Sequence, residues 1–254
     1  MNDEERRRVA DANVVAAFSL ARKHHAQMPG GVRRFGSVDA IATGSASGFF
    51  NPVLALRPES TLADVATAVS WIEELGLLAS VQVGADLDAR VRPGLEVLGF
   101  APDPWQMPIM VLELGGSRPP DPGRVEIRTG QAELFDDWHA ALATSDAVRP
   151  VLGPGLLGDP DVRVSVGYLD GAPVSCAAAI RSDSCVGIYA VGTLEHARRR
   201  GIGRAVTWAA IEAGASAWGS SIAILQSSEM GVPVYRSMGF QEITRYVEYA
   251  RPAR

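Results

Sequence analysis

A basic, glycine-containing segment in the second half of the chain has residue types suited to binding an anion. Residues 188–205 contain an apolar run, a loop with three consecutive arginines and two glycines, and an amphipathic run of helical spacing. Glycines let successive backbone N–H groups face outward, and a helix start adds its positive end. The cations of this segment are Arg198, Arg199, Arg200 and Arg204. We interpret the segment as a cradle for a small polyanion, with a solvated basic loop that caps a helix as the alternative.

Two common phosphate-binding patterns do not fit this loop. No Gly-Lys-Ser/Thr follows it, as a Walker loop requires, and Val206 stands where GxGxxG needs its third glycine. The GxGxxG match at residues 153–158 leads into Asp-Pro and a strand-like run, so we discard it. A nucleotide-binding protein that uses the arginine loop stays open as an interpretation.

A second block downstream carries a resemblance to a known family. Residues 225–240 end in the pattern Tyr235-x-x-x-Gly239-Phe240. Together with Arg198-x-x-Gly201-x-Gly203, this block resembles the signatures of the GNAT N-acetyltransferases, whose loop binds the pyrophosphate of acetyl-CoA. The order of strands and helices around the motifs agrees, and the resemblance covers roughly residues 124–251.

The resemblance implies a role for each matched position. The strand before the loop would splay from its neighbour and offer main-chain groups to the pantetheine arm, while the loop amides would hold the pyrophosphate and Ser228 would lie near the pantetheine. The positions implied for acetyl-CoA binding are Val191, Gly192, Thr193, Arg198, Arg199, Arg200, Gly201, Ile202, Gly203, Arg204 and Ser228. Tyr235 matches the tyrosine that faces the thioester sulfur.

The implied chemistry is direct attack of an amine on the thioester carbonyl, with the oxyanion stabilised by an N–H of the splayed strand at Val191. Because the pKa of tyrosine is near 10 and that of a thiol about 8.5, full proton transfer from Tyr235 to the thiolate is uphill by about 2 kcal/mol. We therefore interpret Tyr235 as a hydrogen-bond donor to the leaving sulfur; a surface hydroxyl on an amphipathic helix is the alternative. The candidates for a general base, none of which the sequence singles out, are His139, Glu195, His196 and Glu229.

The first half repeats the order of elements in a weaker form. A strand-like run at residues 53–56 precedes a helix that begins after Thr61. Residues 95–100 align with residues 235–240, but a leucine stands where the second half has Tyr235, and no Arg-x-x-Gly-x-Gly precedes the helix. We interpret the first half as a degenerate GNAT copy, the alternative being that any strand-helix-strand-helix run would align as well.

The densest Gly/Pro stretch, around residues 115–123, predicts a linker between the halves. We expect a degenerate GNAT-like domain at residues 1–115, a linker at 116–123 and a catalytic GNAT acetyltransferase domain at 124–254. The expected fold class is α+β (mixed α/β), with two GNAT-like domains that each have a central mixed, mostly antiparallel sheet flanked by helices.

Periodicity and turn signals predict the individual elements. Helices are expected at residues 4–26, 61–74, 86–98, 131–144, 203–217 and 232–238, the third of them broken near Pro93-Gly94. Strands are expected at residues 38–43, 53–56, 79–83, 107–114, 125–128, 162–169, 174–180, 186–193, 221–226 and 244–249. Asp170-Gly171 predicts a hairpin turn between two of them.

The composition of the chain excludes several classes of protein. With 254 residues, 47% of them hydrophobic and 21% charged, the chain is not disordered. Two cysteines, Cys176 and Cys185, exclude a disulfide framework and a four-cysteine zinc site, and favour a reduced, cytoplasmic setting without a metal. The acidic start lacks a signal-peptide pattern, and the longest uncharged run, residues 40–56, is broken by glycine and proline. We expect a soluble protein without nucleic-acid or membrane partners, as a monomer or homodimer.

The predicted function is an acetyl-CoA-dependent N-acetyltransferase that acts on a primary amine of a small molecule or peptide. Acetyl-CoA would serve as the acyl donor. A non-catalytic acyl-CoA-binding or sensing protein is the alternative, since it would keep the loop but would not need Tyr235. The sequence does not identify the acceptor, the general base or a ligand of the first half.

Overall fold

The computed structural model describes residues 1–115, 125–143, 149–183 and 185–252. In the first half the elements are α1 (Asp3–His24), β1 (Gly31–Phe35), β2 (Val38–Ala42), η1 (Gly48–Phe50), β3 (Pro52–Ala55), α2 (Leu62–Glu74), β4 (Ser80–Gly84), α3 (Ala85–Val97), β5 (Ala101–Pro102) and β6 (Met107–Glu113). In the second half they are β7 (Glu126–Gly130), η2 (Ala132–Leu134), α4 (Phe135–Leu142), α5 (Pro154–Leu157), β8 (Val162–Leu169), β9 (Ala172–Ser182), β10 (Cys185–Thr193), η3 (Glu195–Ala197), α6 (Ile202–Trp218), β11 (Ile222–Gln226), α7 (Val232–Ser237) and β12 (Gln241–Ala250).

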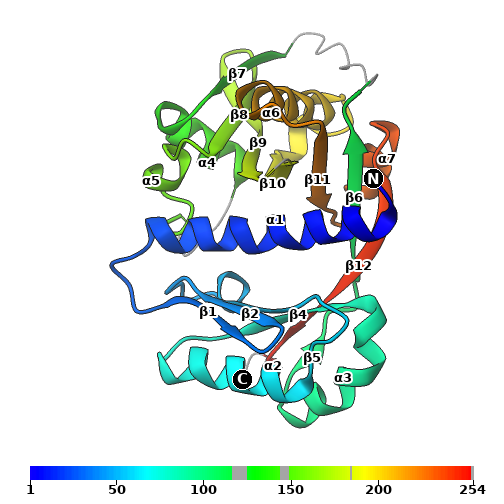
Figure 1. Ribbon diagram of the computed structural model, residues 1–254. Helices are drawn as coiled ribbons and strands as arrows, with labels where there is room; N and C mark the ends of the chain where they lie inside the picture. Colours follow the sequence, from blue (N-terminus) through cyan, green and yellow to red (C-terminus); the bar gives the residue numbers. More distant parts are fainter. Residues whose placement is uncertain (116–124, 144–148, 184, 253–254) are drawn as a thin grey trace.

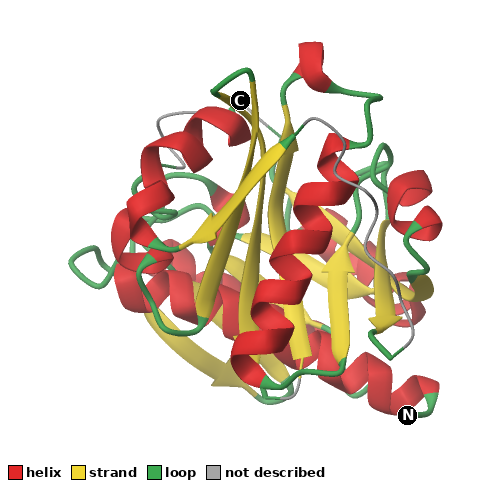
Figure 2. Cartoon of the chain, turned by 90° about the horizontal axis from the view of Figure 1, so that it is seen from above, coloured by secondary structure: helices red, strands yellow, loops and turns green. Residues whose placement is uncertain are grey.

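The described strands form one continuous sheet that runs through both halves. Its order is β1-β2-β3-β4-β12-β6-β11-β10-β9-β8-β7, with β5 paired to β12. Most neighbours are antiparallel; β3 with β4 and β10 with β11 are parallel. Figure 2 shows the strands at the centre of the molecule with helices to either side. The predicted mixed, mostly antiparallel architecture is confirmed.

The two halves exchange a strand at the middle of this sheet. β6, which ends the first half, lies between β11 and β12, and pairs with β11 from Ile109↔Gln226 to Glu113↔Ile222. β12, which ends the second half, lies between β4 and β6, and pairs with β4 from Tyr246↔Gly84 to Ala250↔Ser80. Each final strand therefore completes the ladder of the other half (Figure 1).

The internal repeat has a matching turn in each half. The N–H of Phe100 donates to the carbonyl of Leu95 at 2.9 Å, and that of Phe240 to the carbonyl of Tyr235 at 3.0 Å. The glycine before each phenylalanine has a positive φ, 83° in the first half and 96° in the second. This is the glycine-dependent helix end in which an N–H reaches back five residues. The aligned hexapeptides thus have the same structure, which is consistent with a degenerate first copy.

Helix α1 packs against both halves across the middle of the molecule (Figure 1). Asn2 and Glu5 form a capping box at its start, and acidic residues fill its first turn. Val14 and Phe18 pack with β2, β3, β6 and β11, whereas Ala17 and Ala21 pack with β8 and β9. At its end Lys23 and His24 contact the buried Asp159 at 2.8 and 2.6 Å. The helix therefore fixes the two halves against each other.

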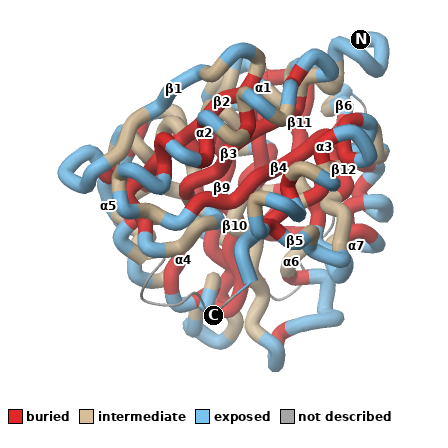
Figure 3. The backbone as a smooth tube through the Cα atoms, turned by 90° about the horizontal axis from the view of Figure 1, so that it is seen from below, coloured by how far each residue is buried: buried red, intermediate tan, exposed pale blue. Residues whose placement is uncertain are grey.

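The apolar cores lie on both faces of the sheet. One cluster packs α2 and α3 against the strands of the first half, and another packs α6 and α7 against those of the second. Figure 3 shows buried central strands such as β3 and β4, while the helices around them are only partly buried. No helix in the described part of the chain is long and apolar enough to cross a membrane.

The expected break near Pro93-Gly94 is wrong, because α3 continues from Ala85 to Val97 with Pro93 inside it. The glycine has a packing role instead. A Cβ added at Gly94 would lie 1.9 Å from Cδ2 of Leu62, so the missing side chain lets α2 approach. The helix expected at 131–144 is a 3-10 turn followed by α4, and strand β1 was not predicted. The linker expected at 116–123 lies outside the described residues, and the domain boundaries stay a prediction.

Candidate acyl-CoA site and adjoining cavity

Strand β10 leaves its parallel neighbour halfway along its length. It pairs with β11 from Cys185 to Ile188, and the register of its pairing with β9 then shifts between Tyr189 and Gly192. Ala190 sits in this bulge with a φ of 49°, a conformation that is rare outside glycine. Beyond this bulge β10 no longer pairs with β11, and Val191 and Gly192 line a cavity.

The basic loop that follows brings the start of α6 to the same cavity. Arg199 and Gly201 have positive φ values of 59° and 77°, which turn the chain into the helix at Ile202. No side chain within the described residues caps this helix start, so its first N–H groups are available to an anion. Gly203 allows the close approach of α6 to β10, since an added Cβ would lie 2.8 Å from Oγ1 of Thr193.

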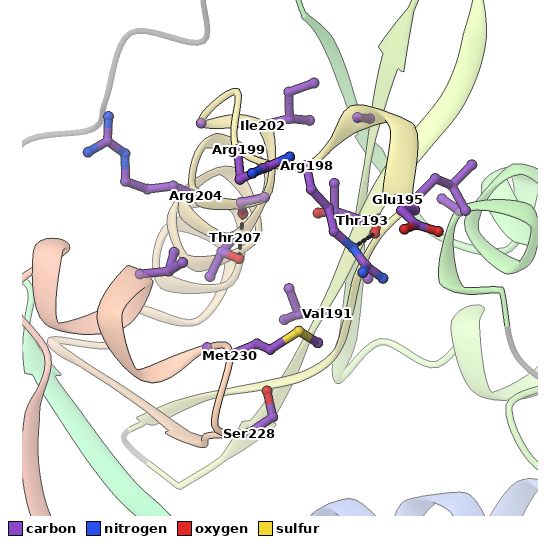
Figure 4. Close-up of a pocket in the computed structure, with 18 of the residues that line it drawn as sticks. Val191, Thr193, Glu195, Arg198, Arg199, Ile202, Arg204, Thr207, Ser228 and Met230 are labelled. Carbon is purple, nitrogen blue, oxygen red and sulfur yellow. Dashed lines mark hydrogen bonds between the residues drawn. The ribbon is translucent and has the colours of Figure 1, made fainter.

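The arginines of the loop take different positions. Arg198 donates from Nε to the carbonyl of Thr193 at 3.0 Å, toward β10 (Figure 4). Arg199 and Arg204 also line the cavity, on the side of α6. Arg200 is exposed and does not line it. Three of the four predicted cations therefore surround one space.

This first cavity has a volume of about 710 Å³. Figure 4 shows Arg198 and Arg199 near one end and Ser228 and Met230 near the other, with Val191 between them. The predicted positions that the structure brings together here are Val191, Gly192, Thr193, Arg198, Arg199, Gly201, Ile202, Gly203, Arg204, Ser228 and Tyr235. The sequence did not predict the wall formed by the end of α4, at residues 141–143.

Tyr235 lies on α7 and lines the cavity. Its side chain is buried, and its ring is 5.8 Å from that of Phe240, centroid to centroid. Gly231 makes room for it, because a Cβ there would lie 2.7 Å from Cε2 of Tyr235. Burial raises the pKa of Tyr235 to about 12. The hydroxyl therefore stays protonated near neutral pH and can donate a hydrogen bond.

A second cavity, of about 680 Å³, adjoins the first. The two share Leu142, Val191, Ser228 and Tyr235 on their walls. Both halves line it: α1 and η1 contribute phenylalanines, the segment before β6 contributes Asp103 and Trp105, and β12 contributes Glu248. Burial, and to a lesser extent Asp103, raises the pKa of Glu248 to about 7.

The sequence analysis did not predict the residues that line this second cavity, because the exchange of strands between the halves brings them together. A local signal existed at Glu248, a lone acid among the apolar and aromatic residues 246–249. That signal could not show which strand it would face. In the structure Glu248 lies opposite Gln82 of the first half.

The other base candidates lie elsewhere. Glu229 and His196 are exposed, Glu195 lines the outer part of the first cavity, and His139 is buried with Nε2 2.9 Å from the carbonyl of Leu152. Burial lowers the pKa of His139 and raises that of the Cys176 thiol to about 12. Among the described residues, no three His, Cys, Asp or Glu side chains are placed together to hold a metal ion.

In the first half, the loop before α2, at residues 57–61, is held by hydrogen bonds and an ion pair within the fold. Arg57 binds Asp39 at 2.7 Å, and Arg90 donates to the carbonyls of Pro58 and Ser60 at 2.5 and 2.9 Å. The side chain of Thr61 accepts the N–H of Asp64 and so caps the helix start. The start of α2 therefore has one N–H capped by a side chain, and its neighbouring arginines are bonded within the fold, unlike the start of α6.

Comparison with known proteins agrees with this geometry. Residues 127–240 match the model of the acetyltransferase (GNAT) family. None of the curated proteins compared with the sequence matches it. The match covers both motifs of the second half, so this region resembles a GNAT acetyltransferase domain, as the two motifs indicated.

Solved structures with the same fold extend over the whole chain. A GCN5-related N-acetyltransferase from Kribbella flavida has a TM-score of 0.73 at 20% identity, over 98% of this chain and 96% of that one. A tandem GNAT protein from the clavulanic acid biosynthesis pathway has a TM-score of 0.59 at 12% identity, over 100% and 97%. A GCN5-related N-acetyltransferase from Sphaerobacter thermophilus has a TM-score of 0.55 at 18% identity, over 86% and 78%. The first two of these structures share the fold over nearly the whole chain, and the third over most of it.

Proposed function

We propose that this acetyltransferase uses acetyl-CoA and transfers the acetyl group to a primary amine by direct attack on the thioester. The observation that carries the proposal is the junction of the two cavities at Val191 and Tyr235. A thioester at that junction would have a backbone N–H on one side, a phenol on the other and a second chamber behind its carbonyl.

The first cavity supports acetyl-CoA as the donor. The uncapped start of α6 and the positive-φ loop offer N–H groups to a pyrophosphate, and Arg199 and Arg204 add charge. The end of β10 stays paired with β9 but not with β11, and the edge that faces away from β9 can form strand-like hydrogen bonds with the amides of a pantetheine arm.

The junction supports the chemical step. The N–H of Val191 would stabilise the oxyanion that forms when the amine adds to the carbonyl. The Tyr235 hydroxyl would donate a hydrogen bond to the sulfur as the C–S bond breaks. Two buried, free cysteines fit the cytoplasmic setting included in this proposal.

Calorimetry with acetyl-CoA and a thiol-release screen over amines test the proposal. We expect acetyl-CoA to bind and at least one amine to release coenzyme A. Tight binding of acetyl-CoA without turnover on any amine would favour the acyl-CoA sensor instead. Binding of ATP that coenzyme A does not displace would favour the nucleotide-binding alternative.

A further inference from the structure

We infer that the second cavity receives a primary amine with an apolar, aromatic-sized body, and that Glu248 accepts the proton of its ammonium group. The inference rests on the proposed acetyl transfer, because that reaction would place the thioester at the wall that the two cavities share, at Val191 and Tyr235. It adds the class of acceptor and the missing base.

The body of the cavity is apolar and aromatic. Its walls include Phe18, Phe49, Phe50, Trp105 and Tyr189, with aliphatic side chains from α5, β9 and β10 between them. Such walls favour a substrate that buries rings or alkyl groups, and penalise one that must shed water from many polar groups. The volume of about 680 Å³ suits a small molecule.

The polar end of the cavity is acidic. Asp103 is fixed near β12, since its N–H donates to the carbonyl of Glu248 at 2.7 Å and its Oδ1 accepts the N–H of Trp105 at 2.7 Å. No lysine or arginine is among the described residues that line the cavity. Two carboxyl groups without a lining cation favour a positively charged ligand, and the nearby indole can add a cation–π contact.

Glu248 is the better placed of the two acids to accept a proton. It is half-buried on β12, whereas Asp103 is exposed. The other ionisable residues that line the cavity within the described part of the chain are Asp103, Tyr189 and Tyr235, and the neutral Gln82 is paired with Glu248 across β4 and β12. Burial and Asp103 together raise the pKa of Glu248 to about 7, which brings this carboxylate closer to an amine in basicity than an ordinary glutamate.

The ammonium group gives one proton to the Glu248 carboxylate, and the nitrogen lone pair then forms the C–N bond at the thioester carbonyl. As the C–S bond breaks, a second N–H proton passes to the sulfur, which Tyr235 holds by a hydrogen bond. The third hydrogen stays on the amide, and Glu248 releases its proton to solvent, giving one proton per turnover.

Steady-state acetylation of matched amines tests the acceptor class. We expect 2-phenylethylamine and tryptamine to give kcat/KM values at least about tenfold above that of ethanolamine, because ring burial contributes more than 1.4 kcal/mol. Phe49→Ala should lower this preference and leave the acetyl-CoA Kd unchanged. If ethanolamine is the better substrate, the assigned class is wrong while the proposed acetyl transfer still stands.

Glu248→Gln tests the base. We expect kcat to fall by about 10²-fold or more with an unchanged acetyl-CoA Kd. The rise of wild-type kcat/KM with pH, centred near pH 7, should disappear in this variant. Glu242→Gln, on the same strand but outside the cavity, is the matched control and should keep wild-type kcat.

Two results would overturn the role of Glu248: a Glu248→Gln enzyme with near-wild-type kcat, or a wild-type rate that does not change between pH 6 and 8. The pH profile needs only the wild-type chain, so it decides the matter even if the variant does not fold. A chain that acetylates no amine at all would instead refute the proposed function.

Discussion

At the scale of single residues, Tyr235 links the two cavities and has a hydroxyl that stays protonated. Its raised pKa, to about 12, makes it a poor proton donor to a thiolate of ordinary pKa, but a constant hydrogen-bond donor across the working range. The burial that places the ring at the junction therefore also sets its role.

We expect Tyr235→Phe to lower kcat by about 10²-fold, because the leaving sulfur loses its hydrogen bond. The shape of the pH–rate profile below pH 9 should not change, since a group with a pKa of about 12 does not titrate there. Thiol-release assays over a range of pH would measure both effects, and calorimetry with acetyl-CoA would show whether binding is unchanged.

Tyr168→Phe is the matched control, because that hydroxyl donates to Asp137 at 2.6 Å and does not line either cavity. It should keep wild-type kcat. A Tyr235→Phe enzyme with unchanged kcat would remove the tyrosine from the mechanism.

At the scale of elements, the approach of α6 to β10 sets the geometry of the anion cradle. Gly203→Val should raise the Kd for acetyl-CoA at least about tenfold, because the new side chain clashes with Thr193 and displaces the helix start. Gly115→Val is the control, since no described residue beyond its chain neighbours comes within 4 Å of a Cβ there. Equal affinities of both variants in calorimetry would show that this contact does not shape the site.

Helix α1 is joined to the second half by a buried carboxylate. Burial would raise the pKa of Asp159, but hydrogen bonds from Lys23, His24 and the N–H of Asp161 outweigh it and lower that pKa to about 2. A lowered pKa stabilises the fold above the unfolded value near 4, and this stabilisation is lost as pH falls toward 2.

Asp159→Asn should therefore lower the free energy of unfolding by about 2 kcal/mol at pH 7. The difference from wild type should shrink between pH 4 and pH 2. Urea unfolding at both ends of that range measures it, and a difference that persists at pH 2 would mean that charge is not the cause.

At the scale of the whole molecule, the exchange of β6 and β12 makes the halves structurally dependent on each other. We propose that residues 1–115, 116–123 and 124–254 are the two domains and the linker in sequence, although the two domains do not form separate sheets. A truncation before residue 120 would also remove β6 from between β11 and β12. Deleting the first half is therefore not a clean test of its role in choosing the acceptor.

Cutting the chain should show this dependence. We expect fragments 1–115 and 125–254 to copurify and bind acetyl-CoA when coexpressed, and to lack cooperative unfolding when expressed separately, because each ladder then lacks a strand. A fragment 125–254 that alone folds and binds acetyl-CoA with wild-type affinity would show an independent domain.

The sequence predicted what short-range patterns encode. The loop at 198–204 and the helix end at 235–240 are contiguous motifs, so their positions around the first cavity follow from local turns and helix starts. The predicted helix break at Pro93-Gly94 was wrong, because the sequence alone does not distinguish a glycine that allows close helix packing from one that ends a helix. The group around Glu248 could not be predicted, since it depends on pairing between strands more than 150 residues apart.

The strand exchange also limits how substrates can enter and leave. Swinging the halves apart would break the ladders between β6 and β11 or between β12 and β4, and would pull α1 from one side. Domain closure is thus an unsuitable motion for each turnover. The second cavity would instead open by movement of short segments that line it, such as η1, whose Phe49 is 41% exposed. Exchange of the acceptor should therefore be governed by side-chain and loop motion, on a faster timescale than hinge motion between domains.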